Sequence, residues 1–197
     1  MNNKKILLFA FVLIAIVQLS VPSKMIWDRE RILELGKEFK FETAPIDPAD
    51  PFRGKYIVLQ FKEATVLLNS DTQWIEGEQI YAVLKTDNKG FAKIDYVTRE
   101  KPDFNIDYVN AKIEYVIEFP KKSLHISFPF DRFYMEESKA FDAELAYLET
   151  QLDSTKTTYA LVVIKEGDAV LKHVLIDGVP IREIVIDRLQ KGRNSAE

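Results

Sequence analysis

The chain has 197 residues, of which 47% are hydrophobic and 29% are charged, and its net charge is −4. This composition is typical of a globular protein with one core-forming domain, and the absence of a basic run argues against nucleic acid as a partner. Cysteine is absent and there are two histidines, His125 and His173, which excludes disulfides, thiolate sites and a histidine-rich metal site.

A hydrophobic segment follows two lysines at the amino end. Apolar residues run without interruption from Ile6 to Val17, and the apolar character continues to Trp27. A helix over residues 6–27 would rise about 33 Å, enough to cross a bilayer core of roughly 30 Å. A cleaved signal peptide and a buried soluble helix are the alternatives, but small residues are poorly placed for cleavage and the apolarity is all-round. We therefore predict an uncleaved signal-anchor in residues 1–22, with Trp27 at the far interface.

The orientation of this anchor rests on the usual arrangement of exported proteins. Lysine and arginine are nearly balanced on its two sides, so the positive-inside rule does not decide it. A short basic amino end followed by a long domain predicts a single-pass membrane protein with its domain on the extracytoplasmic, periplasmic side. The lipid bilayer is then its first partner.

The segment after the anchor divides into a helix and a strap. Residues 23–40 have the spacing of an amphipathic helix that continues the membrane helix, with Met25, Ile32, Leu35 and Phe39 near one face. Residues 41–54 contain three prolines, which forbid helix and favour extended geometry before each proline. We expect a stiff Asp-Pro-rich strap that leads into a sheet.

Alternating apolar residues dominate residues 55–190, which we expect to form one β-rich domain. Ile57, Leu59 and Phe61 share one face of the first strand, and a hairpin turns at residues 88–90. Residues 110–119 form the cleanest strand, in which every second residue from Ala111 to Phe119 is apolar. A further strand covers residues 124–130. Such closely spaced strands are mostly antiparallel.

The carboxyl-terminal part contains one helix and three closing strands. Residues 138–152 have apolar residues at helical steps, namely Phe141, Leu145, Leu148 and Leu152. The closing strands cover residues 158–165, 169–177 and 181–187, and the polar tail of residues 191–197 is expected to fray. The predicted fold class is α+β, a mostly antiparallel sheet or partly open barrel with one internal helix.

The stretch "GKYIVLQF" resembles the signature of the GDYXXLXY family of membrane-anchored bacterial proteins. Lys55 stands in place of the family's Asp, and Phe61 in place of its final Tyr. The order of membrane helix, short helix and Asp-Pro-rich approach also matches, as do residues 132–144 and the closing hairpin. The signature and its approach comprise Asp47, Pro48, Asp50, Pro51, Arg53, Gly54, Tyr56, Leu59 and Phe61. The resemblance implies a domain of unknown function, often encoded near multi-pass membrane proteins, without established catalytic residues.

A polar network is predicted between the signature and the second matching segment. Its members are Arg53, Arg132, Tyr134, Glu137 and Glu144. Arg53 either pairs with one of the glutamates and pins the helix to the sheet or binds an anionic ligand. Glu137 and Glu144 are seven residues apart, about 10 Å on a helix, which fits a shared metal or acid pair poorly. We predict no metal, no cofactor and no catalytic residue, and enzymatic activity stays open.

Three functional interpretations remain. The first is an accessory or interaction module for a membrane protein partner, such as a multi-pass protein. The second is a small-ligand binding domain. The third is a Ser–Lys peptidase, because "VPSKM" after a membrane helix is similar to the serine box of type I signal peptidases. Ser23 would be its nucleophile and Lys55 or Lys93 its base, but the second serine of that box is missing.

Overall fold

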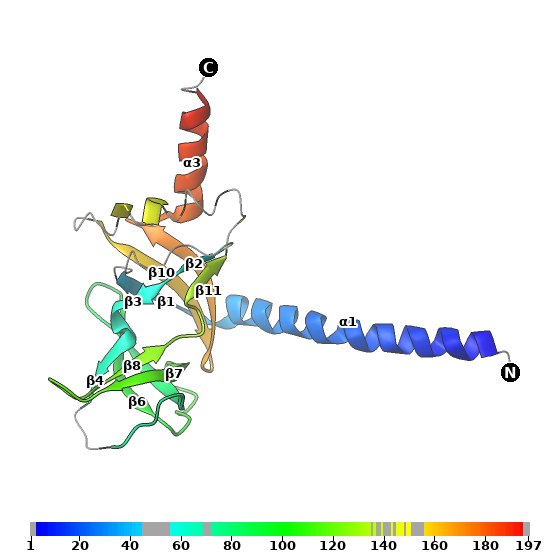
Figure 1. The fold of residues 1–197 in the computed structure, drawn as a ribbon, viewed down its shortest axis with the longest axis horizontal. Coiled ribbons are helices and arrows are strands. Elements are labelled where there is room, and N and C mark those ends of the chain that lie inside the picture. The colour runs from blue at the N-terminus through cyan, green and yellow to red at the C-terminus, as the bar shows by residue number, and fades with distance from the viewer. Residues whose placement is uncertain are drawn as a thin grey trace.

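A long helix projects from a body of antiparallel strands (Figure 1). The computed structural model describes residues 3–44, 56–68, 72–134 and 156–194, together with residues 136, 139, 143, 145–147, 149 and 150. The helices are α1 (Asn3–Leu35) and α3 (Ile181–Asn194), and η1 (Lys62–Ala64) is one turn of 3₁₀ helix. The strands are β1 (Lys37–Ala44), β2 (Tyr56–Val58), β3 (Gln60–Phe61), β4 (Thr65–Leu67), β5 (Gln79–Thr86), β6 (Ala92–Thr98), β7 (Tyr108–Ile117), β8 (Ser123–Ser127), β9 (Arg132–Tyr134), β10 (Thr158–Lys165), β11 (Asp168–Ile176) and β12 (Val179–Pro180). The predicted α+β class is confirmed.

The helix α1 is long and apolar enough to cross a bilayer. It has 33 residues and contains Pro22 without a break, and its most apolar stretch packs against no part of the body. Leu7, Phe9 and Phe11, for example, are all exposed. An apolar surface of this extent is costly in water and is satisfied by lipid. The helix is therefore consistent with single-pass anchoring.

The predicted helix over residues 23–40 ends early. α1 stops at Leu35, and Lys37–Ala44 is strand β1, so Phe39 and Phe41 are buried from a strand. The reason is that Phe39 and Phe41 alternate with the charged residues Glu38, Lys40 and Glu42, and this period-two pattern places both rings on one face of a sheet. The expected apolar stripe is correspondingly short: Ile32 is buried, whereas Met25 and Leu35 are exposed.

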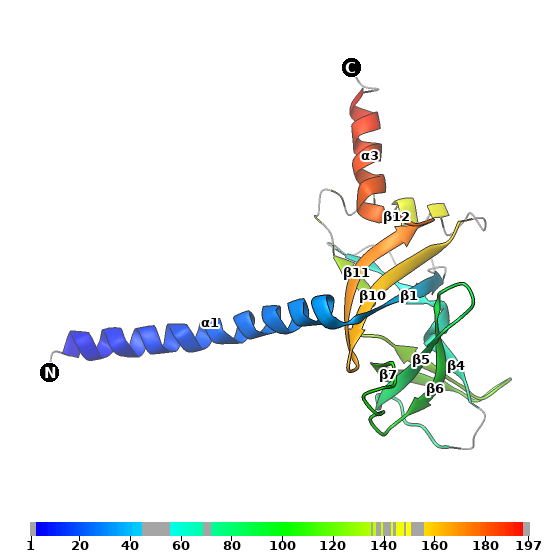
Figure 2. The ribbon, with the colours of Figure 1, turned by 180° about the vertical axis from the view of Figure 1, so that it is seen from behind.

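A single residue, Gly36, joins α1 to β1. Its N–H donates to the carbonyl of Ile32 at 2.8 Å. A β-carbon on Gly36 would lie 2.5 Å from that carbonyl oxygen, 2.6 Å from Cγ1 of Val163 and 2.9 Å from the carbonyl oxygen of Ile164. Glycine is therefore required here by close approach to β10. Figure 2 shows β1 continuing from the end of α1 into the body, away from the amino end.

Two five-stranded sheets form most of the body. The first has the order β12-β11-β10-β1-β3, and the second has the order β4-β8-β7-β5-β6. β2 pairs with β9 in a separate ladder. All of these ladders are antiparallel, while isolated parallel bridges at Lys40↔Phe91 and Val109↔Gly167 join the two large sheets. The predicted turn at residues 88–90 is present, and further turns lie at residues 166–168 and 177–178, with Gly90, Gly167 and Gly178 at positive φ.

Four phenylalanines form the centre of the core between the sheets. The rings of Phe41, Phe61, Phe128 and Phe130 lie 5.0 to 5.8 Å apart, mostly edge to face. Such aromatic pairs stabilise by about 0.5–1.5 kcal/mol each beyond their area burial. β1, β3 and the segment that follows β8 are thus held together by one aromatic cluster.

Buried hydroxyl groups attach the internal helix to the sheet. Residues 139, 143, 145–147, 149 and 150 are helical. The Thr150 hydroxyl lies 2.7 Å from the Tyr147 carbonyl oxygen, to which it donates, and 3.3 Å from the Thr158 hydroxyl. The Thr43 hydroxyl donates to the Thr158 carbonyl at 3.0 Å. Burial raises the pKa of Tyr147 to about 12, and Thr43 beside its hydroxyl offsets part of that effect. The Tyr147 hydroxyl makes no hydrogen bond of normal geometry within the described part of the chain.

Two further predictions about helices are wrong. Leu145 is 42% exposed, because the buried face of the internal helix includes the smaller Ala143 and Ala146. Residues 181–187 form the start of α3 and not a strand, and this helix runs through the expected tail to Asn194. Ile181 and Val185, four residues apart, are both fully buried. That spacing fits one helix face and one strand face alike, so the local pattern does not distinguish the two structures.

Candidate functional site

The signature stretch is mainly a core element in the part that the structure describes. Ile57, Leu59 and Phe61 are 2%, 3% and 5% exposed and face the interior as predicted. The Leu59 N–H donates to the Asp131 carbonyl at 2.7 Å, which continues the pairing of β2 with β9. Asp47, Pro48, Asp50, Pro51, Arg53 and Gly54 lie outside the described residues. Leu59 and Phe61 are therefore explained by packing, and Tyr56 is left as a signature side chain near the surface.

Tyr56 contacts two members of the predicted polar network. It lies directly opposite Tyr134 in the β2–β9 ladder, with ring centroids 5.4 Å apart. The Arg132 guanidinium lies over the Tyr56 ring at 5.2 Å. Its interaction with the Tyr134 side chain, aided by the charge of Asp131, raises the pKa of Arg132. Arg53, Glu137 and Glu144 fall outside the described residues, so the rest of the network stays a prediction.

A groove of about 510 Å³ lies between the signature strands and the second sheet. We call it the signature groove. Leu59, Phe61, Ile126 and Phe128 are its buried floor. Its rim contains Val58, Gln60, Thr65, Glu114, Tyr115, His125 and Asp131. Val58 also pairs with Arg132 in the β2–β9 ladder, so the groove adjoins the surface formed by Tyr56, Arg132 and Tyr134. An apolar floor with a few polar groups at the rim is typical of binding sites.

A β-bulge in β7 shapes one wall of the groove. Ile113 pairs with Ile126, but Tyr115 and not Glu114 pairs with His125, so Glu114 is the extra residue. A bulge shifts the alternation of side chains between the faces of a strand. Tyr115, expected in the core, is consequently 43% exposed, and Phe119 near the end of the strand is 85% exposed. The predicted single apolar face of residues 111–119 therefore holds only as far as Ile113.

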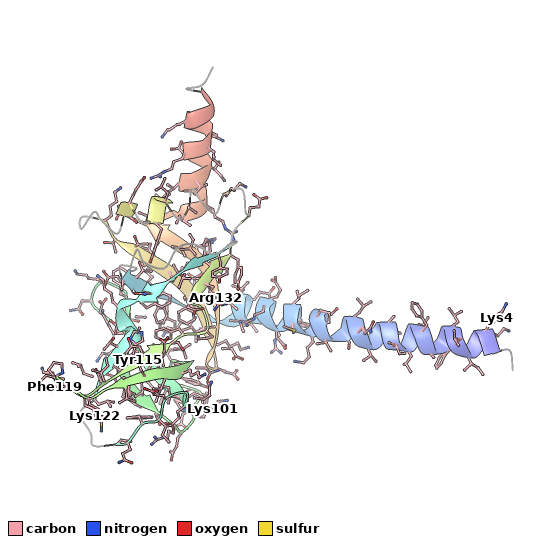
Figure 3. The ribbon with its side chains drawn as sticks, viewed as in Figure 1. Lys4, Lys101, Tyr115, Phe119, Lys122 and Arg132 are labelled. Atoms are coloured by element: carbon pink, nitrogen blue, oxygen red, sulfur yellow. The ribbon has the colours of Figure 1, made fainter. Side chains whose placement is uncertain are left out.

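His125 is bound on several sides within this wall. Its Nδ1 lies 3.3 Å from the Thr65 hydroxyl, and its Nε2 lies 3.6 Å from a carboxylate oxygen of Glu114. Its ring stacks on Tyr115 with centroids 4.5 Å apart and planes 10° apart. The sequence pattern did not show these partners, which come from two other strands, β4 and β7. Figure 3 shows Tyr115 and Arg132 on the body, well removed from Lys4.

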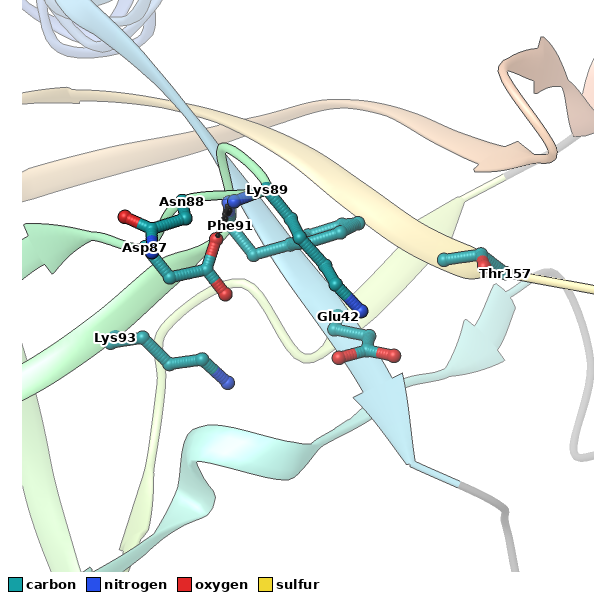
Figure 4. A pocket seen from close by; sticks show the side chains of 7 residues that line it. All are labelled: Glu42, Asp87, Asn88, Lys89, Phe91, Lys93 and Thr157. Atoms are coloured by element: carbon teal, nitrogen blue, oxygen red, sulfur yellow. Dashed lines mark hydrogen bonds between the residues drawn. The ribbon is translucent and has the colours of Figure 1, made fainter.

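A second cavity of about 430 Å³ lies between β1 and the β5–β6 hairpin (Figure 4). Two of its charged side chains are paired: Lys93 donates to Glu63 at 2.6 Å, and Glu42 accepts from Lys62 at 2.6 Å. The hydrogen bond to Glu63 raises the pKa of Lys93. Hydrogen bonds from the turn's backbone N–H groups, chiefly that of Phe91, lower the pKa of Asp87. This cavity is therefore a stabilised contact between the two sheets and a weaker candidate than the signature groove.

The residues proposed for catalysis are not brought together. The Ser23 hydroxyl donates to the Leu19 carbonyl at 2.8 Å on the exposed surface of α1, whereas Lys93 pairs with Glu63 on the body. Lys55 lies outside the described residues. Glu136, another acid near the internal helix, pairs with Lys139 at 2.5 Å, which lowers its pKa. The described residues contain no group of three acidic or histidine side chains able to hold a metal ion. The Ser23–Lys93 arrangement thus receives no support.

The comparisons with known proteins agree with the signature. No curated protein and no solved structure is significantly similar to this chain. The family model described as GDYXXLXY protein matches residues 18–174, from within α1 to β11. Because this match covers most of the chain, the protein belongs to the GDYXXLXY family.

Proposed function

We propose that this protein is a membrane-anchored interaction module that presents the signature groove to a membrane protein partner outside the cytoplasm. The observation that carries the proposal is the one-residue joint between α1 and the body. A flexible tether would let the body move freely, whereas this joint makes the membrane helix and a central strand of the first sheet nearly one element.

Three contacts hold this joint. Gly36 packs against β10 without room for a side chain. Ile32, one turn earlier, is 8% exposed. The Arg29 guanidinium donates to the Ala169 carbonyl on β11 at 2.8 Å. Together they connect the last two turns of α1 to the hairpin of β10 and β11, so the body has a set orientation relative to the membrane helix. A set orientation is useful for engaging another membrane protein, because it restricts both partners to compatible geometries and lowers the entropy lost on binding.

The orientation in the membrane is tested by single-cysteine labelling. The chain has no cysteine, so one introduced residue gives an unambiguous signal. We expect a membrane-impermeant maleimide to label Lys101→Cys on the exposed surface of the body in intact cells. Lys4→Cys is expected to react only after the membrane is permeabilised. Labelling of the amino end, but not the body, in intact cells would reverse the proposed topology.

The docking role is tested by photo-crosslinking in native membranes. p-Benzoylphenylalanine replaces Gln60 at the groove rim, and the same residue at Lys101 is the matched control because both positions are exposed. We expect a protein adduct specific to position 60, containing an integral membrane protein identified by mass spectrometry. Equal adduct formation from both positions, or none from position 60, would contradict the docking role.

The signature groove also favours a second function, the binding of a small ligand. The observation is its buried floor of Phe61 and Phe128 beneath a polar rim. Native mass spectrometry of the protein released gently from membranes would detect a co-purifying small molecule. A Val58→Trp substitution, which fills the groove from its rim, should then abolish the added mass. Retention of that mass in the variant would place the ligand elsewhere.

A further inference from the structure

We propose that the signature groove binds a basic side chain, lysine or arginine, carried on an extended extramembrane segment of the partner. This inference rests on the docking role above and adds the chemistry that selects the segment. Its basis is the charge of the groove rim, the aromatic wall and the position of the groove along the chain that leaves the membrane.

The rim contains two carboxylates with spare hydrogen-bonding capacity. Glu114 and Asp131 have side chains that are 57% and 46% exposed. Within the described part of the chain, His125 Nε2 lies 3.6 Å from Glu114 and Arg132 Nε lies 3.8 Å from Asp131. Charge-assisted hydrogen bonds are shorter, at about 2.7–2.9 Å, so neither carboxylate is saturated by these neighbours. A cation from a partner has two acceptors available at this rim.

The cation already in the groove lining does not satisfy these acceptors. Lys62 donates to Glu42 on β1 at 2.6 Å. It is therefore engaged outside the rim and does not neutralise the two rim carboxylates. Among the charged side chains of the groove lining, this leaves an excess of negative charge.

The aromatic wall and the apolar floor of the groove also suit a lysine or arginine side chain. Tyr115 stacks one face on His125 and remains 43% exposed, so part of its ring is accessible to a cation. Phe61, Phe128 and Val58 provide apolar surface for the aliphatic stem that lysine and arginine share. A carboxylate ligand would meet two like charges here, and a purely apolar segment would leave both acids without a partner.

The path of the chain places the groove above the lipid. With Trp27 at the interface, the eight residues to Leu35 rise about 12 Å. β1 then runs for eight residues, up to about 26 Å, and ends at Ala44, which lines the groove. Figure 2 shows this strand leading away from the amino end of α1. The groove is thus up to about 38 Å from the interface, which favours an extramembrane protein segment over lipid headgroups or a transmembrane helix.

The test uses the full-length chain with p-benzoylphenylalanine at Gln60 in native membranes. We expect the crosslinked peptide to contain lysine or arginine and to map to an extramembrane segment. The double substitution Glu114→Gln and Asp131→Asn removes both charges, and we expect the adduct yield to fall about tenfold or more, as for loss of charge-assisted hydrogen bonds. The matched control is Glu100→Gln with Asp103→Asn, two exposed acids outside the groove lining, which should leave the yield unchanged.

Several results would overturn the inference. These are a crosslinked peptide without a basic residue near the site of attachment, a lipid or transmembrane adduct, and an undiminished yield from the Glu114 and Asp131 double variant. A yield lost equally in the control variant would also overturn it. Circular dichroism melting of each variant distinguishes misfolding from lost recognition, and Glu114→Asp, which keeps the charge, should retain most of the yield. A position-60 adduct with the wrong chemistry leaves the docking role intact, whereas complete absence of an adduct removes both proposals.

Discussion

Substitution of Gly36 by alanine provides a direct test of the joint between α1 and the body. The added β-carbon would meet two backbone oxygens, at 2.5 Å from Ile32 and 2.9 Å from Ile164, and Cγ1 of Val163 at 2.6 Å. Such approaches require the helix end or β10 to move, because backbone atoms cannot rotate away as the end of a long side chain does. Overpacking costs about 1–3 kcal/mol in well-packed sites. Because the added atom would make three close contacts at once, we expect a destabilisation of about 3 kcal/mol.

The expected consequence is a lower melting temperature of the body. For a domain of this size, each 1 kcal/mol shifts the melting temperature by about 2–4 °C, so Gly36→Ala should lower it by about 6–12 °C. Near-ultraviolet circular dichroism of the full-length protein in detergent follows the packing of the aromatic core, which lies entirely in the body.

The matched control is Gly178→Ala. Gly178 has a φ of +86° with no atom within 4 Å of an added β-carbon. It therefore tests backbone strain without crowding, and we expect a cost of about 1 kcal/mol. If Gly36→Ala melts within about 1 °C of the unsubstituted protein, the joint accommodates a side chain, and its assignment as a tightly packed connection is wrong.

Two further predictions concern the signature and the buried tyrosine. Leu59→Ala should destabilise the body by about 2–5 kcal/mol, as for other buried leucines. Tyr56→Ala should cost about 1 kcal/mol through the lost aromatic pair. Denaturant unfolding compares the two variants, and equal losses of stability would contradict the assignment of Leu59 to the core and Tyr56 to the surface. Tyr147 has its pKa raised from 10.0 to about 12, so unfolded chains lose this proton first, and the folded state should lose stability as the pH rises from 10 towards 12. Tyr147→Phe should remove this pH-dependent part of the free energy of unfolding, which amounts to about 2–3 kcal/mol near pH 12. At neutral pH the substitution should change stability little. Identical loss of stability at alkaline pH in both proteins would refute the prediction.

Local patterns in the sequence determined much of the fold. The apolar character of residues 6–27 extends far enough for a helix that crosses a bilayer, and the structure leaves this stretch uncovered. The alternation of Ile57, Leu59 and Phe61 identified their buried face, since a strand turns successive side chains to opposite sides. Glycines in the turns at residues 167 and 178 marked positions of positive φ, which glycine adopts without steric cost.

Tertiary structure decided the rest, because the deciding contacts join residues far apart in the chain. The alternation in residues 111–119 gave no sign of a bulge at Glu114, which depends on pairing with β8. Residues 181–187, predicted as a strand, begin the helix α3, because their short apolar run fits both periods until packing selects one. The signature groove likewise brings together residues 58–65, 114–115 and 125–131 from separate strands. No local pattern specifies such a meeting, because it arises only when the two sheets close over their shared aromatic core.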